Sequence, residues 1–347
     1  AQTLRVLCRL EKKLDSKEQL DDNGVPLVYL NGEDVRVGIN ATFRSIASVL
    51  KYDKVINKSR GDNDKIRKGY YESESPVVDK VKESIGFSSG GILRTIECSI
   101  MDLADDIAYS TYDLEDNLKA GFVDLPDMIS QQPYFYEELS RLVTKAFKEN
   151  SLHRNKRFNE KHMLKELEKF VQYFIFPNED IKDLKNEESD DWYIKVAGSV
   201  EQTASQYSRS GYYRNFLSSQ LVSWCVENVE LHDEGEDNPI FWQVRLPESI
   251  QTRVETLKRF NFLIQIMSPR MRVVAYRGKE IVAKLFEVMA NDPSLLPDDF
   301  REYYTLCPES DEERVICDYI SCMTDRYAVE LYGKITSENN KTFFSPH

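Results

Sequence analysis

Apolar residues recur every three and four positions along most of the chain, which is the spacing of one face of an α-helix. This pattern predicts helices within the segments 38–53, 90–122, 133–150, 161–176, 213–231, 254–267, 279–292 and 314–335. A different pattern occurs at 25–37, where VPLVYL and VRVG flank the turn sequence NGED and predict a β-hairpin. Polar breaks fall at 57–76, 177–191 and 232–239. The pattern therefore predicts an all-α fold with one small hairpin.

Composition narrows the class of protein. The 347 residues are 41% hydrophobic, which is enough for one large core or two smaller ones. No apolar run approaches the roughly 18 residues that a membrane span needs, and the net charge of −13 argues against a surface built to coat nucleic acid. The six cysteines form no CxxC pair. These features predict a cytoplasmic protein with reduced thiols and no membrane partner.

One predicted helix is unusually acidic. The stretch MDLADDIAYSTYDLED, residues 101–116, contains five aspartates and one glutamate. At helical spacing, one face carries Asp105, Tyr109, Tyr112, Asp113 and Asp116, whereas Asp106 points about 100° away from Asp105. Carboxylates separated by tyrosines suit a hard cation and a sugar. A solvated acidic face fits the same spacing, so the pattern by itself leaves both interpretations open.

The acidic segment resembles a known family. SIMDLADDIAYSTYDLEDNLKAG resembles the metal-ligand helix of the bacterial deoxyguanosine triphosphate triphosphohydrolases, which belong to the HD-domain superfamily. Further segments resemble that family in the same order, so the resemblance extends from Ala1 to about residue 332; they are AQTLR, GINATFRSIASVLKYDK, KGYYESE, RGKEIVAKLF and RVICDYISCMTDRYAVELY. The resemblance implies one HD-type helical body over 1–347 with a C-terminal helical subregion at 240–347.

The resemblance also implies an activity. Family members hydrolyse a deoxynucleoside triphosphate, here expected to be dGTP, to the deoxynucleoside and tripolyphosphate by attack of a metal-activated water on the α-phosphorus. By similarity, Asp105 would bind the divalent cation, Mg²⁺ or Mn²⁺. Tyr109 would line the sugar pocket and exclude a ribose 2′-hydroxyl, and Asp113 would accept a hydrogen bond from the 3′-hydroxyl. A homo-oligomer is expected as well, with the final predicted helix as core or subunit interface.

Further nucleotide contacts are implied elsewhere in the chain. Lys51, Tyr52 and Lys68 match positions where the family places basic and aromatic groups toward the nucleotide, although surface positions would explain both lysines equally well. A lysine there can neutralise charge on the triphosphate. Arg209 and Tyr213, four residues apart, would share a helix face and contact base or phosphate. Packing of tyrosines at a helix start is the alternative for this pair.

The histidines depart from the family pattern. The family's metal site also uses a His and a His-Asp pair, and the four histidines here are His153, His162, His232 and His347. The His-Asp pair at 232–233 lies in the acidic sequence VELHDEGEDNP, which predicts a solvated loop. The remaining metal ligands and the catalytic residues are therefore expected upstream of Ala1, and the chain alone is expected to be inactive. The alternative is a non-catalytic nucleotide-binding or scaffolding protein.

The segment LHRNKRFNEKHMLK, residues 152–165, is basic. It could contact single-stranded nucleic acid through its cations and Phe158. A solvated face beside a helix is the simpler interpretation.

Overall fold

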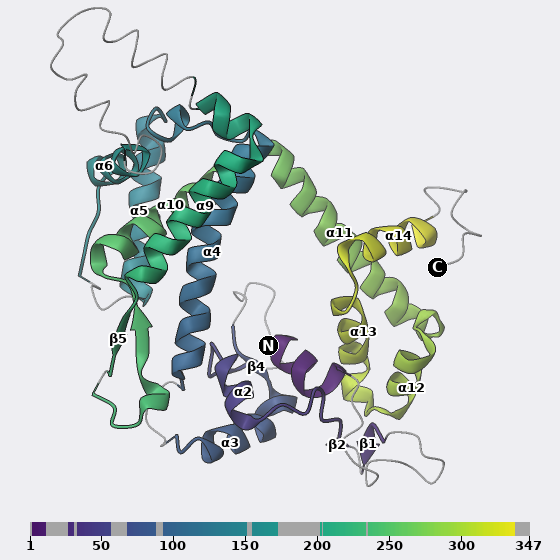
Figure 1. The fold of residues 1–347 in the computed structure, drawn as a ribbon. Coiled ribbons are helices and arrows are strands. Elements are labelled where there is room, and N and C mark those ends of the chain that lie inside the picture. The colour runs from purple at the N-terminus through teal and green to yellow at the C-terminus, as the bar shows by residue number, and fades with distance from the viewer. Residues whose placement is uncertain are drawn as a thin grey trace, which may run out of the picture. The chain divides into compact units, whose positions relative to one another are not determined.

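The computed structural model describes residues 2–11, 27–30, 33–56, 68–87, 93–150, 155–172, 202, 204–233 and 235–336. Within these ranges helices dominate, and each strand is only two or three residues long (Figure 1). The all-α prediction is confirmed, and β1 (Tyr29–Leu30) pairs antiparallel with β2 (Glu33–Asp34) inside the predicted hairpin. None of the described helices has the length and apolar character that a membrane crossing requires.

The chain divides into two compact units. One unit combines residues 1–94 with 272–347, and the other contains residues 95–271. The helix α11 (Pro269–Asn291) includes the second point at which the chain passes from one unit to the other. The predicted subregion at 240–347 stays a prediction.

The unit formed by residues 95–271 is a packed set of helices. In Figure 1, α4, α9 and α10 run side by side, and α10 also contacts α5 and α6. Its core combines buried side chains from all these helices, including Leu114, Leu139, Leu167, Leu217 and Phe260. The helices are α4 (Ile96–Ala120), α5 (Pro133–Asn150), α6 (Glu160–Phe170), α9 (Gly211–Glu227) and α10 (Glu248–Met267), with 3-10 turns at Pro126–Met128 and Pro239–Phe241.

The acidic helix α4 has local start and stop signals. Thr95 precedes it, and the Thr95 side chain accepts a hydrogen bond from the Cys98 amide at 3.2 Å. Gly121 follows it with φ of 68°, in the left-handed region that glycine adopts without strain. These signals explain why the 25-residue helix begins at Ile96 and ends at Ala120, within the predicted segment 90–122.

The other unit is built from both ends of the chain. Its N-terminal part contains α1 (Gln2–Arg5), the π-helix η1 (Val6–Leu10), β1 and β2, α2 (Phe43–Ser48), β3 (Val55–Ile56), β4 (Tyr70–Tyr71), η3 (Glu72–Glu74) and α3 (Ser75–Ser84). Its C-terminal part contains most of α11, η7 (Pro293–Leu295), α12 (Asp298–Leu306), η8 (Glu309–Asp311), α13 (Glu312–Ser321) and α14 (Asp325–Thr336).

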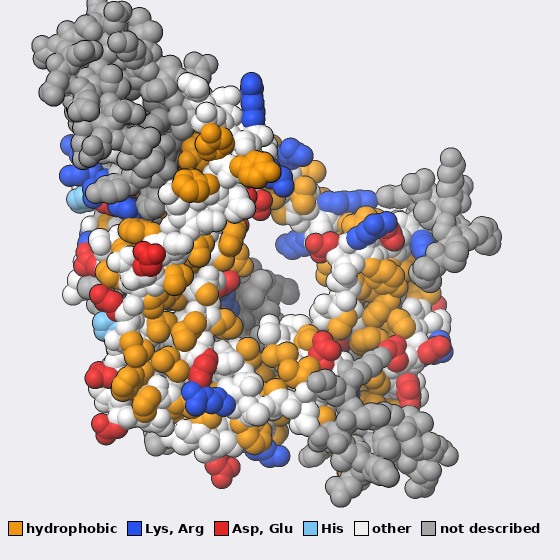
Figure 2. Space-filling view, viewed as in Figure 1, with side chains coloured by type: hydrophobic (Ala, Val, Ile, Leu, Met, Phe, Trp, Pro, Cys, Tyr) orange, Lys and Arg blue, Asp and Glu red, His pale blue; other side chains and the backbone are white. Residues whose placement is uncertain are grey.

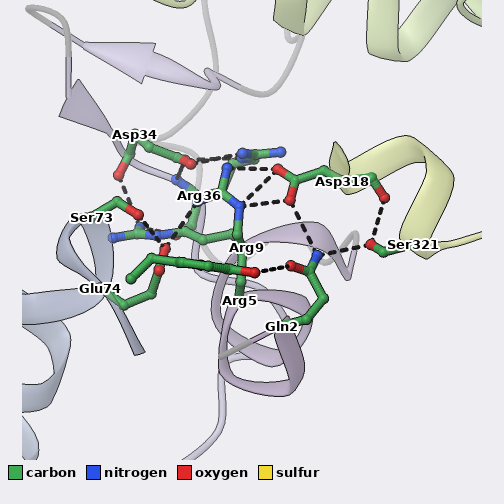
Figure 3. Close-up of polar contacts among 10 residues, drawn as sticks. Gln2, Arg5, Arg9, Asp34, Arg36, Ser73, Glu74, Asp318 and Ser321 are labelled. Carbon is green, nitrogen blue, oxygen red and sulfur yellow. Dashed lines mark hydrogen bonds and ion pairs between the residues drawn. The ribbon is translucent and has the colours of Figure 1, made fainter. Parts of the chain in front are cut away.

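A buried ion network joins the two ends of the chain within this unit (Figure 3). The Arg5 guanidinium contacts Glu74 Oε1 at 2.9 Å and Asp318 Oδ2 at 2.6 Å. All three side chains are almost completely inaccessible to solvent. Burial acts to lower the pKa of Arg5, but the hydrogen bond and charge of Asp318, together with Glu74, raise it above its ordinary value. Gln2 extends the network by donating to Asp318 and to Ser321.

Several helix boundaries differ from the prediction. The segment 314–335 forms two helices, because Thr324 accepts a hydrogen bond from the Tyr327 amide and caps a new start. In 38–53 only Phe43–Ser48 is helical, and Thr42 caps it. The helices α3 and α12 were not predicted. Residues 57–67 of the polar break at 57–76, the break at 177–191, and residues 173–176 of one predicted helix lie outside the described residues.

All six cysteines lie in the described part of the chain, and none forms a disulfide there. Cys8, Cys98 and Cys225 are buried, whereas Cys322 is exposed. Burial raises the pKa of Cys8 and of Cys225 to about 11, so both thiols stay protonated at neutral pH.

Candidate functional site

The two adjacent aspartates of α4 have different surroundings. Asp105 is exposed. Asp106 is partly buried and forms an ion pair with Lys258 of α10. The Lys258 ammonium also lies 3.8 Å from Glu255, whose side chain is 7% exposed. Asp106 is therefore part of the packing between α4 and α10, whereas Asp105 is presented at the surface.

The remaining residues of the predicted face follow Asp105 along the surface of α4. Tyr109 is 50% exposed and Tyr112 is 54% exposed. Asp116 is exposed and Asp113 is half-buried. Burial, and after it the negative charge of Asp116, raises the pKa of Asp113 above its ordinary 3.8. This face can present carboxylate oxygens and tyrosine rings to one ligand.

Two lysines meet at one tyrosine in the other unit. The Lys68 ammonium donates a hydrogen bond to the Tyr52 hydroxyl at 3.0 Å and lies 5.0 Å from the centre of the Tyr52 ring. The Lys51 ammonium lies 5.9 Å from the same ring centre. Tyr52 is 38% exposed, and Lys68 is exposed. The structure thus brings together three residues that the sequence analysis selected from two separate segments.

A short parallel strand pair brings the two segments together. Val55 and Ile56 of β3 pair with Tyr70 and Tyr71 of β4. The Tyr70 amide donates to the Lys54 carbonyl at 2.9 Å. A Cβ added at Gly69 would lie 2.0 Å from that same carbonyl oxygen, so no other residue fits without moving the backbone. Gly69 therefore allows the approach that places Lys68 beside Tyr52.

The acid next to this cluster is neutralised separately. Asp53 follows Tyr52 directly, but its side chain is 6% exposed and pairs with Lys82 of α3 at 2.7 Å. The Leu93 amide also donates to the Asp53 carboxylate, at 3.4 Å. Lys82 therefore compensates the charge of the acid that directly follows Tyr52.

Arg209 and Tyr213 do not share one helix face as predicted. Residues 204–209 are helical, but Ser210 has φ of −109° and ψ of 120°, and α9 begins after it. The buried Arg214 closes the first helical segment by donating to the carbonyls of Tyr207 and Ser208 at 2.9 and 2.8 Å. The Tyr213 ring packs edge-on against Tyr207 with 5.8 Å between ring centres. This contact favours the packing alternative for Tyr213.

Side chains of the basic segment, residues 152–165, also pack against neighbouring helices. The Phe158 ring lies 5.0 Å from that of Phe147 in the core of its unit, and Lys156 pairs with Glu248. These contacts favour the interpretation of residues 155–165 as a face beside a helix. Residues 152–154 lie outside the described part.

The described histidines are not gathered at Asp105. His232 belongs to β5 (Glu230–His232), which pairs with β6 (Gln243–Arg245), and its ring lies 3.4 Å from Glu230. The predicted loop thus begins as a strand. His162 is in α6, and His153 and His347 lie outside the described residues.

The metal site expected from the sequence is only partly represented in the structure. Within the described ranges, no group of three or more His, Cys, Asp or Glu side chains could hold a metal ion. Asp105 offers one carboxylate ligand, and the described residues do not complete a metal centre around it. The other ligands and the catalytic residues were expected upstream of Ala1. Ala1 itself lies outside the described residues, which begin at Gln2, so this expectation stays a prediction.

Two residues that support the acidic face were not predicted. Lys258 pairs with Asp106. Asn261 lies between two phenylalanines in the sequence and is completely buried, although its side chain is polar. A polar residue on the apolar side of the predicted helix 254–267 was the signal that could have identified Asn261.

Comparisons with known proteins support the family resemblance noted in the sequence. The family model described as the phosphohydrolase-associated domain matches residues 244–334. The chain is 36% identical to "Deoxyguanosinetriphosphate triphosphohydrolase-like protein 2" of Mesorhizobium japonicum, an alignment that covers 100% of the chain and 72% of that protein. A "Deoxyguanosinetriphosphate triphosphohydrolase-like protein" of Vibrio parahaemolyticus is 23% identical over 86% of the chain and 65% of its own length. One of Aliivibrio fischeri is 27% identical over 70% of the chain and 45% of its own length.

The extent of these alignments decides the family. The chain spans 72% of the Mesorhizobium japonicum protein and between about half and two thirds of several other relatives. Because the first alignment covers every residue of the chain at 36% identity, the chain belongs to the family of deoxyguanosinetriphosphate triphosphohydrolase-like proteins in the HD-domain superfamily.

Proposed function

We propose that the protein hydrolyses deoxynucleoside triphosphates, with dGTP as the expected substrate, to a deoxynucleoside and inorganic tripolyphosphate. The relatives' names point to this reaction, and membership of their family supports carrying it over to this chain. Water would attack the α-phosphorus and the bond from that phosphorus to the 5′-oxygen would break. The deoxynucleoside would then leave, and the three phosphates would stay joined as tripolyphosphate, which keeps the oxygen of the water.

The observation that carries the proposal is the meeting of Lys51, Tyr52 and Lys68. Tyr52 and Lys68 are 16 positions apart, and both lie in segments that resemble the nucleotide contacts of the family. Two ammonium groups at one tyrosine ring supply positive charge in a chain whose net charge is −13. A polyanionic triphosphate needs such a local positive field to bind an acidic protein. These lysines would also neutralise the charge that develops on the triphosphate oxygens as water attacks.

The acidic face of α4 would recognise the sugar. Asp113 would accept a hydrogen bond from the 3′-hydroxyl, and the half-exposed Tyr109 ring would form a wall beside C2′. Close contact with that wall would leave no room for a 2′-hydroxyl, so deoxynucleotides would be preferred over ribonucleotides.

A divalent cation, Mg²⁺ or Mn²⁺, lowers the pKa of a water molecule that it coordinates and so supplies a hydroxide nucleophile when bound. Asp105 is the described residue proposed to contribute a ligand to it. The homo-oligomer and the cytoplasmic location stay predictions.

The test is to incubate the full-length protein with dGTP, dATP, dCTP or dTTP and Mg²⁺ or Mn²⁺, and to separate the products by anion-exchange chromatography. GTP is the matched control for sugar recognition. Tripolyphosphate together with deoxynucleoside, and little turnover of GTP, is the expected result. Release of orthophosphate or pyrophosphate would refute cleavage of the bond between the α-phosphorus and the 5′-oxygen. Tight dGTP binding without any turnover would instead favour the non-catalytic nucleotide-binding protein.

A further inference from the structure

The acidic helix α4 is held by a series of polar contacts from residues 244–261. The Ser99 hydroxyl donates to the Val244 carbonyl at 3.2 Å and accepts from the Val244 amide at 2.9 Å. Further along α4, Lys258 pairs with Asp106. Beyond that point Asn261 contacts the turn that carries Tyr109. This segment opens the region that matches the phosphohydrolase-associated domain.

Asn261 uses both ends of its amide on α4. Its nitrogen donates to the Ser110 carbonyl at 3.2 Å and lies 3.5 Å from the Tyr109 carbonyl. Its oxygen accepts a hydrogen bond from the Asn117 side chain at 3.2 Å. Asn117 lies seven residues after Ser110, which is nearly two helical turns, so these contacts line one side of α4.

Both asparagines are buried where an unmade hydrogen bond is costly. Asn261 is 0% exposed and Asn117 is 1% exposed. Apolar packing between two helices tolerates small rotations, because hydrophobic contacts have no preferred direction. A buried amide has fixed donor and acceptor positions, and rotation of α4 about its axis would leave them unsatisfied.

We propose that Asn261, together with Asn117, is a positioning residue that sets the rotation of α4 about its axis, so that Asp105, Tyr109 and Asp113 face the deoxynucleotide. This inference rests on the proposed function. The side of α4 that contains Ser110, Leu114 and Asn117 is buried, and the neighbouring side presents the predicted site residues. Lys258 supports the same orientation by holding Asp106 on the α10 side.

The decisive variant is the double substitution Asn117→Leu with Asn261→Leu in the full-length protein. Asn261→Leu alone would leave the Asn117 amide unsatisfied and can simply prevent folding. The double variant replaces both partners by apolar side chains of similar size, which preserves stability but removes the directional contact. It is expected to melt within about 3 °C of the wild type. Ser218→Ala is the matched control, since it removes the 2.6 Å hydrogen bond from α9 to Glu115 of α4.

The expected result is a tenfold or larger fall in kcat/KM for dGTP in the double variant, carried mainly by KM because Tyr109 and Asp113 would contact the sugar. Ser218→Ala should stay within twofold of the wild type. A structural role alone would lower the melting temperature and leave kcat and KM of the folded protein unchanged. Kinetic constants within twofold of the wild type in the double variant would overturn the proposal.

A second readout does not depend on turnover. The amides of Asp113 and Leu114 donate to the carbonyls of Tyr109 and Ser110 in helix geometry, so their hydrogen exchange reports the turn that Asn261 contacts. Exchange of these amides should be faster in the double variant and unchanged in Ser218→Ala. If the wild type releases no tripolyphosphate, the proposed function fails, and this exchange experiment decides the positioning role: equal exchange in all three proteins would overturn it.

Discussion

Asp105 and Asp106 show how neighbouring identical side chains acquire different roles. One helical step turns the side chain by about 100°, and this step directs Asp106 toward α10 and leaves Asp105 exposed. Asp106 is held by Lys258 of α10, and we expect the exposed Asp105 carboxylate to be the one that binds a cation. The difference between the two residues is therefore testable by substitution.

Asp105→Ala in the full-length protein should abolish both metal binding and dGTP turnover, because the cation would lose a charged ligand. Asp106→Ala is the matched control, since it removes the adjacent carboxylate and should affect metal content much less. Metal content by mass spectrometry and turnover are measured side by side. Loss of metal in Asp106→Ala with retention in Asp105→Ala would show that the ligand assignment is wrong by one residue.

Asp113→Asn should leave metal bound and weaken substrate binding, because a carboxylate that accepts a hydrogen bond from a hydroxyl contributes roughly 1.5–3 kcal/mol. KM for dGTP should rise roughly 10- to 150-fold. Because burial and Asp116 raise the pKa of Asp113, this carboxylate becomes protonated at a higher pH than an ordinary aspartate. As pH falls, the KM of the wild type should therefore begin to rise at a higher pH than it would with an ordinary aspartate at this position. An unchanged KM in Asp113→Asn would exclude the sugar contact.

The same raised pKa has a consequence for stability. A carboxyl whose pKa is higher in the folded than in the unfolded chain binds protons more readily when folded, so its contribution favours folding at low pH and is lost as pH rises through the folded pKa. Asp113→Asn should therefore not lower, and should slightly raise, the melting temperature near pH 7. A clear decrease in melting temperature would contradict the stated origin of the shift.

At the scale of elements, the pairing of β3 with β4, which is two residues long, places Lys68 beside Tyr52 and Lys51. The pair β3 and β4 is too short to be stable alone, and Gly69 permits its closest approach, where the Lys54 carbonyl fills the space that a Cβ would need. The hydrogen bond from Lys68 to Tyr52 depends on this approach.

Gly69→Ala should displace β4 from β3, because its Cβ would lie 2.0 Å from the Lys54 oxygen. We expect a loss of stability of about 1–3 kcal/mol from the forced backbone shift and a higher KM for dGTP as Lys68 leaves Tyr52. Urea denaturation and steady-state kinetics measure the two effects. Gly278→Ala is the control, since its added Cβ meets no atom within 4 Å. Equal behaviour of the two variants would refute the steric explanation.

At the scale of the molecule, the N-terminal helix is tied to α13 across 313 positions by the bond from Arg5 to Asp318. Hydrophobic side chains also reach the surface over both units on the side drawn in Figure 2. A buried ion network is costly to break on one side, because the remaining charges are left without compensation.

Arg5→Met should lower the free energy of unfolding by about 3–5 kcal/mol, since Glu74 and Asp318 would stay buried without their cation. Arg326→Met is the matched control: Arg326 pairs with Glu330 at 2.8 Å, but its side chain is 90% exposed. Its loss should leave the free energy of unfolding nearly unchanged, because solvent screens an exposed ion pair. Urea denaturation followed by circular dichroism compares the two variants, and similar midpoints would contradict the structural role of Arg5.

The sequence by itself determined the features that depend on neighbours a few positions away. Helical spacing placed Asp105, Tyr109 and Asp113 on one face, and Thr95 and Gly121 set the ends of that helix. The break at Ser210 shows the limit of helical spacing, since a separation of four residues predicted that Arg209 and Tyr213 share one helix face.

Only the tertiary structure decided which segments meet. A periodic pattern shows that one side of a helix is buried, but hydrophobic burial has no direction and does not name the partner. The contact of Asn261 with Ser110 joins residues 151 positions apart, and the contact of Arg5 with Asp318 joins residues 313 positions apart. Such contacts depend on the packing of the complete fold, because the entropy lost in closing long loops is offset only when many contacts form together.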